Sequence, residues 1–184
     1  MRHKLENLWR FFYKYLDRPW YIIFVMAMAA ADLFVAFIPT ELLLVMAVLA
    51  RPARWVSAAL LVTLGSAIGA YALGWLVDRG GAPVVEWFIP NAFQTEIWRK
   101  AATFLEDYGA SSIGLVALSP IPQQPVVLMG ALTQMPLWKI FLGVFVGRGV
   151  KYLFFAWAAT HAPKLMGHWF KKIPTEAHLP TNVS

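Results

Sequence analysis

Four charged side chains interrupt the long apolar stretches of this 184-residue chain. Asp32 and Glu41 lie in the first apolar run, and Arg148 and Lys151 lie in the last one. A charged group at membrane depth is costly, so it usually faces a protein interior or a water-filled cavity and has a function there. We therefore expect the two acids and the two bases to share one polar site.

The two acids flank a proline, and this arrangement has a chemical consequence. If Pro39 divides the run into two arms, a hairpin brings Asp32 and Glu41 to the same cavity. Desolvation raises the pKa of a carboxyl group. We therefore expect these acids to bind and release protons near neutral pH, which would couple the site to a proton gradient.

The bases and two amides favour an anionic partner. Arg148 carries a planar guanidinium that suits a phosphate group, and Lys151, one helical turn further, shares its face. Gln123 and Gln124 follow the second proline-rich segment, where they could donate hydrogen bonds to the same group. The predicted ligands are protons and a lipid with a phosphate headgroup.

Each of these interpretations has a purely structural alternative. The acids could pair with the bases only to hold the helices together, and Asp32 could be a helix N-cap. Gln123 and Gln124 could simply cap broken backbone. We expect no metal and no cofactor, because the chain has no cysteine and its four histidines have no ligand spacing.

Composition indicates an all-α polytopic membrane protein. Hydrophobic residues make up 59% of the chain and charged residues 14%, whereas soluble domains average about 45–50% and about 25%. The net charge of +6 fits cationic flanks that face anionic lipid better than it fits a nucleic-acid partner. The length predicts a single membrane domain over residues 1–170.

Two apolar regions, residues 20–50 and 110–135, are predicted to be re-entrant hairpins. A straight helix over 20–50 would reach about 46 Å at 1.5 Å per residue, which is too long for one crossing of a hydrocarbon core about 30 Å thick and too short for two. Pro39 would break it. The second region contains three prolines near its centre, Pro120, Pro122 and Pro125, which we count with Pro39 as the hairpin breaks.

The remaining segments complete the predicted domain. Small residues four apart, such as Gly65 and Gly69, suggest close helix packing in the first span. The predicted elements are an amphipathic interfacial helix over 1–18, transmembrane helices over 54–78 and 137–162, a surface helix over 93–108 and a flexible tail over 171–184.

The two halves of the chain share an ordered pattern. Pro39 precedes Trp55 by 16 residues, and Pro122 precedes Trp138 by the same number. Most Lys and Arg residues outside the spans fall on the side of the two termini, which the positive-inside rule places in the cytoplasm. Inverted halves whose broken helices meet at the midplane are typical of transporters.

At these residues the chain resembles the DedA family, also called the SNARE-associated Golgi protein or VTT-domain family, and within it the small YqaA-like branch. The resemblance rests on Asp32 followed by Phe-Ile-Pro-Thr-Glu at 37–41, on the glycine-rich span at 64–81, on residues 108–132 and on Gly-Arg-Gly-Val-Lys-Tyr at 147–152. It implies facing re-entrant hairpins and movement of lipids between leaflets. Family members are linked to polyprenyl phosphate recycling, phospholipid scrambling and proton-dependent envelope maintenance.

The chain departs from the family pattern at two places. Many members carry an aspartate where this chain has Ala70, and two arginines in the second hairpin tip, where it has Ser119 and Pro125. Asp32, Glu41 and Arg148 are the charged groups that remain to carry the function.

We therefore expect a bacterial inner-membrane lipid transporter or scramblase that is not an enzyme. A non-transporting scaffold or assembly factor for envelope maintenance is the alternative. A membrane enzyme ranks third, since the sequence has no phosphatase constellation, no His-Glu-x-x-His motif and no nucleophile elbow.

Overall fold

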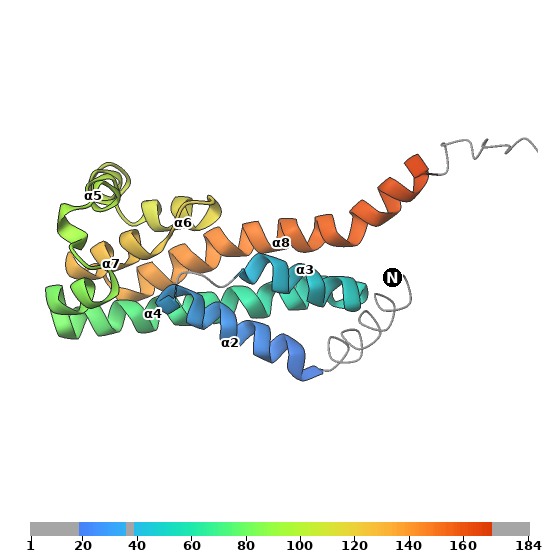
Figure 1. Cartoon of the computed structure of the whole chain (residues 1–184), viewed down its shortest axis with the longest axis horizontal. Coiled ribbons are helices and arrows are strands. Elements are labelled where there is room, and N and C mark those ends of the chain that lie inside the picture. The colour runs from blue at the N-terminus through green and yellow to red at the C-terminus, as the bar shows by residue number, and fades with distance from the viewer. Residues whose placement is uncertain (1–18, 36–38, 171–184) are drawn as a thin grey trace, which may run out of the picture.

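The computed structural model describes residues 19–35 and 39–170, and within these ranges the regular structure is entirely helical (Figure 1). The predicted interfacial helix over 1–18 and the predicted tail over 171–184 lie outside the described residues. The helices are α2 (Pro19–Val35), α3 (Thr40–Ala50), α4 (Trp55–Phe88), α5 (Glu96–Tyr108), α6 (Ser111–Leu118), α7 (Gln124–Leu132) and α8 (Leu137–Phe170), with short 3₁₀ turns η1 (Pro52–Arg54) and η2 (Ala92–Gln94).

Two long antiparallel helices, α4 and α8, form the centre of the molecule (Figure 1). The segments Pro52–Phe88 and Leu137–His161 are long and apolar enough to cross a membrane. Helix α4 extends beyond residue 78, where the predicted span ends. At Gly81 the chain turns, with a φ of 62°, and a second helical stretch follows directly. Pro83 falls in the first turn of that stretch, where it is tolerated.

The helix breaks predicted from the prolines are present. Helix α2 ends at Val35 and α3 begins at Thr40, directly after Pro39. In the second half, α6 ends at Leu118 and α7 begins at Gln124, so that Pro120 and Pro122 lie in the intervening non-helical segment.

Pro125 differs from this prediction, because it is the second residue of α7. A proline in the first turn of a helix loses no intrahelical hydrogen bond, since the amides there have no helical acceptor. Pro125 therefore helps to start α7 and does not contribute to the break.

The short helices pack on the two long ones in a reciprocal manner. Helix α2 packs on α4 and α3 packs on α8, whereas α6 packs on α8 and α7 packs on α4. In each half, the first arm contacts the long helix that follows it, and the second arm contacts the long helix of the other half. The pair α2–α3 covers one end of the α4–α8 pair, and α6–α7 covers the other end (Figure 1).

Glycines allow the first arm to approach its long helix closely. A methyl group at Gly65 would collide with the backbone carbonyl of Met26, and one at Gly69 would collide with that of Ala30. The backbones of α2 and α4 therefore touch, as the spacing of small residues predicts. This contact fixes the position of the last turn of α2 along the axis of α4, and that turn carries Asp32.

Helix α5 lies against the end of the molecule that α7 covers (Figure 1). The Thr95 hydroxyl oxygen accepts a hydrogen bond from the Trp98 backbone amide at 3.2 Å and caps its N-terminus. Trp98, Ala101 and Leu105 are buried, while Glu96 and Lys100 form an ion pair in solvent. The predicted surface helix thus begins at Glu96, three residues later than expected.

Candidate functional site

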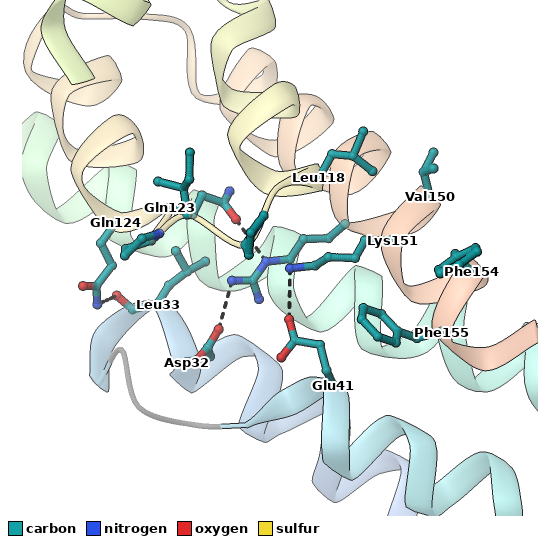
Figure 2. A pocket seen from close by; sticks show the side chains of 14 residues that line it. Asp32, Leu33, Glu41, Leu118, Gln123, Gln124, Val150, Lys151, Phe154 and Phe155 are labelled. Atoms are coloured by element: carbon teal, nitrogen blue, oxygen red, sulfur yellow. Dashed lines mark hydrogen bonds and ion pairs between the residues drawn. The ribbon is translucent and has the colours of Figure 1, made fainter. Parts of the chain in front are cut away.

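The end of α2, the start of α3 and the segment between α6 and α7 meet around a cavity of about 760 Å³ beside the middle of α8 (Figure 2). Helices α2 and α3 supply Asp32 and Glu41, and α8 supplies Arg148 and Lys151. The second break completes the lining with Pro120, Ile121, Pro122, Gln123 and Gln124. The six side chains that the sequence singles out as binding residues therefore line one cavity.

Asp32 and Arg148 form the more buried of two ion pairs. The Arg148 Nη2 atom lies 2.9 Å from the Asp32 Oδ2 atom, and the two side chains are 9% and 14% exposed. Nη1 of the guanidinium donates to the Tyr152 hydroxyl at 3.0 Å, and Nε donates to the Gln123 Oε1 atom at 3.0 Å. A buried arginine is held well only when carboxylate and hydrogen-bond partners surround it in this way.

Glu41 and Lys151 form the second pair, one helical turn along α8. Their Oε1 and Nζ atoms are 2.9 Å apart, and the Glu41 side chain is 38% exposed. Glu41 lies in the first turn of α3, because the break at Pro39 starts a new helix there. The helix N-terminus favours a negative charge at this place, and the partial exposure leaves the carboxylate open to the cavity.

A chain of hydroxyl groups connects the two ion pairs. The Tyr152 hydroxyl lies 3.0 Å from the Thr40 Oγ1 atom, which in turn donates to the Glu41 Oε2 atom at 3.4 Å. Both Tyr152 and Thr40 are buried. Because Arg148 donates to Tyr152 and Thr40 donates to Glu41, the Tyr152 hydroxyl is the donor to Thr40.

Sequence reasoning did not single out Tyr152 and Thr40. Two local signals could have found them: Tyr152 follows Arg148 by four residues and so shares its helix face, and Thr40 directly precedes Glu41.

The two glutamines have different roles. The Gln124 Nε2 atom donates to the Leu33 backbone carbonyl at 2.6 Å, in the last turn of α2. This bond caps broken backbone, as the structural alternative predicts. It also joins the start of α7 to the end of α2. Gln123 is 5% exposed, and its Nε2 atom has no hydrogen-bond partner among the described residues. Its amide therefore has donors to spare.

The alternatives for the acids can now be compared. Asp32 lies in the last turn of α2, so it is not a helix N-cap. Each acid forms an ion pair with a base of α8 in the wall of the cavity, which agrees with the pairing alternative and also with the expectation of a shared site. The proton-binding expectation considered the two carboxylates alone, whereas a cation lies 2.9 Å from each of them.

The wall of the cavity has both polar and apolar parts. Leu118, Ile121, Val150, Phe154 and Phe155 line it together with the charged groups, and all five are exposed. Figure 2 shows Phe154 and Phe155 beside the Glu41–Lys151 pair. A ligand with both a charged group and a hydrocarbon part would match this distribution of side chains.

Comparison with known proteins identifies a related family. The family model of the VTT domain matches residues 38–160. An uncharacterized protein of Haemophilus influenzae is 24% identical over 119 residues, which is 65% of this chain and 62% of that protein. The chain therefore spans less than two thirds of the length of this curated relative. No solved structure matches.

Proposed function

Because the chain belongs to the VTT-domain (DedA) family of membrane proteins, we propose that it moves a lipid with an anionic headgroup between the leaflets of the bacterial inner membrane. Phospholipids and polyprenyl phosphate carriers both present a phosphate group that fits this description. Assignment to the YqaA-like branch, cytoplasmic termini and the absence of enzymatic activity are parts of the same proposal.

The architecture supports a transport function in one specific way. We propose that α2–α3 and α6–α7 are re-entrant hairpins of an inverted repeat, entering from opposite faces. The reciprocal packing of the four arms on α4 and α8 supports this topology. Irregular backbone at membrane depth is tolerated where it lines a cavity, and Pro120, Ile121 and Pro122 of the second break line one here, together with Asp32 and Glu41 from the helices that flank the first break. The cavity would then lie between the leaflets.

The headgroup would bind to the cationic wall. Arginine has five N–H donors, and the bonds to Asp32, Tyr152 and Gln123 do not use all of them. Phosphate oxygens could accept from the remaining donors of Arg148 and from Lys151, while Gln123 Oε1 holds the guanidinium in place. A guanidinium gives phosphate a planar, directional site.

Proton coupling would follow from competition for the cations. A bound phosphate would draw Arg148 and Lys151 away from Asp32 and Glu41, and a carboxylate that loses its partner in a desolvated site favours the protonated form. Lipid binding would thus promote proton uptake, and release of the lipid would restore the ion pairs. Glu41, as the more exposed acid, would exchange its proton with the cavity first.

The observation that carries this proposal is the placement of two ion pairs, one largely buried and one partly exposed, in the wall of one open cavity beside the helix breaks. The test uses purified protein in liposomes with headgroup-labelled phospholipid and an imposed pH gradient. We expect wild-type protein to move the label between leaflets and Glu41→Gln to abolish the movement, because the neutral amide cannot restore the ion pair with Lys151. Glu86→Gln, an exposed change on α4, is the matched control and should leave transport intact.

Transport by folded Glu41→Gln protein at the wild-type rate would contradict the proposal. The scaffold alternative makes the opposite prediction: neutralising Asp32 and Glu41 lowers stability only, and changes to exposed residues of α5 abolish function.

A further inference from the structure

A second cavity runs between α6 and α8 and has an apolar lining. It has a volume of about 470 Å³, and Leu115, Leu118, Leu142, Val146 and Val150 line it. All five side chains are exposed, with Val146 the most exposed at 61%. We call this cavity the α6–α8 groove.

Glycines form the floor of the α6–α8 groove. A methyl group at Gly147 would collide with the backbone carbonyl of Gly114, and one at Gly143 would lie 3.1 Å from the Ile113 side chain. The helix backbones are therefore in contact along the floor, and the larger leucine and valine side chains rise on either side. The result is a channel of hydrocarbon-like surface rather than a flat helix face.

The groove adjoins the polar cavity, because Leu118 and Val150 line both. Arg148 and Lys151 lie at one end of this combined space, and the other end, near Leu142, is apolar. Leu142 and Val150 are separated on α8 by about 12 Å of helical rise. Charge at one end and hydrocarbon at the other match the two ends of a lipid.

We infer that the α6–α8 groove holds a hydrocarbon chain of the lipid whose headgroup occupies the polar cavity. This inference rests on the proposed function and specifies its substrate as a long-chain amphiphile rather than a free anion. A free phosphate would need only the charged end of the combined space. The groove itself adds little affinity, since lipid tails are as apolar as leucine, so the headgroup holds the molecule and the groove directs its chain.

Another apolar groove provides an internal control. Ile68, Tyr71, Trp138 and Phe141 line it, and its volume is about 330 Å³. It shares no lining residue with the polar cavity. Lipids that reach it would be ordinary bilayer lipids with no preference for a phosphate headgroup.

The test is photo-crosslinking in nanodiscs that contain a trace of phosphatidic acid with a diazirine in one acyl chain. We expect adducts on peptides covering Leu142–Val150 to exceed those on peptides covering Ile68 and Tyr71. Diacylglycerol with the same labelled chain lacks the phosphate, so it should label both grooves equally. Equal labelling of both grooves by the phosphatidic acid would overturn the inference.

Two matched variants test the groove directly. Val146→Trp fills it at an exposed position, and Ile68→Trp adds the same side chain to the control groove. Val146→Trp should reduce groove adducts to the level of the control groove and abolish transport of long-chain phosphatidic acid, while transport of its dihexanoyl analogue persists. Ile68→Trp should change neither. Long-chain transport by folded Val146→Trp protein at the wild-type rate would contradict the inference.

The two proposals can fail separately. If Glu41→Gln still transports lipid while the groove remains preferentially labelled, the transport mechanism is wrong and the groove stands. If transport requires Glu41 but the two grooves label equally, transport stands and the α6–α8 groove is an ordinary lipid-facing surface.

Discussion

Arg148 is the residue on which the arrangement of the site depends most. Its guanidinium bonds to α2 through Asp32, to the second break through Gln123 and to its own helix through Tyr152. Its side chain is only 9% exposed, so these partners replace most of its hydration. A residue that joins three segments in this way stabilises the fold and presents its remaining donors to a ligand at the same time.

Removal of the Asp32 carboxylate tests the structural share of this role. Asp32→Asn leaves a buried guanidinium without its counter-charge, and breaking a buried pair costs about 3–5 kcal/mol. We expect the midpoint of thermal unfolding in detergent to fall strongly, whereas Asp78→Asn, at an exposed site on α4, should not shift it. An unchanged midpoint for Asp32→Asn would show that the pair does not stabilise the protein.

At the scale of the helices, the site exists because two helices stop in the middle of the molecule. The end of α2, the start of α3, the segment between α6 and α7, and the start of α7 bring their side chains beside the same part of α8. The bond from Gln124 to the Leu33 carbonyl satisfies one of the freed backbone groups and ties the two breaks together. Packing on α4 and α8 fixes the positions at which the short helices end along these two long helices. Helix packing therefore controls the geometry of the ion pairs.

The contact between α2 and α4 should therefore be sensitive to the size of residue 69. Gly69→Leu would push against the Ala30 carbonyl, and overpacking of this kind typically costs about 1–3 kcal/mol or more. We expect a lower yield of monodisperse protein and a lower unfolding midpoint. Ile68→Leu, at the adjacent exposed position, should behave like wild type. Equal behaviour of the two variants would mean that α2 and α4 are not in close contact.

Prediction from sequence succeeded where one residue determines the outcome. Pro39 breaks any helix through it, and charges in apolar runs must find partners. It failed where the outcome depends on neighbours, since Pro125 starts a helix instead of ending one. It left open whether Gln123 and Gln124 cap backbone or offer donors to a ligand, and only the contacts distinguish them: Gln124 caps the Leu33 carbonyl, whereas Gln123 Nε2 has no partner among the described residues. The buried hydroxyls of Tyr152 and Thr40 were missed because neither residue type is unusual in a membrane helix, and their role depends on a contact between helices far apart in sequence.

At the scale of the whole molecule, the described helices divide into two parts that approach the site from opposite ends. Helices α2 and α3 come from one end of the α4–α8 pair, and α5, α6 and α7 lie at the other (Figure 1). If α4 and α8 cross the bilayer, each pair of short helices must return to the face from which it entered. The turn between α3 and α4 would then lie on one side of the membrane, and the ends of α5 and α7 on the other.

Cysteine labelling can test this topology without background, because the natural chain has no cysteine. Ala53→Cys, Glu106→Cys and Lys139→Cys each change an exposed residue outside the site. We expect a membrane-impermeant maleimide to label positions 106 and 139 in intact cells and position 53 only after permeabilisation, since the positive-inside rule places the Arg51–Arg54 turn in the cytoplasm. If α6 and α7 together crossed the membrane once, positions 106 and 139 would label from opposite sides, and the re-entrant arrangement would be wrong. Labelling of all three positions in intact cells would instead contradict the crossing of α4.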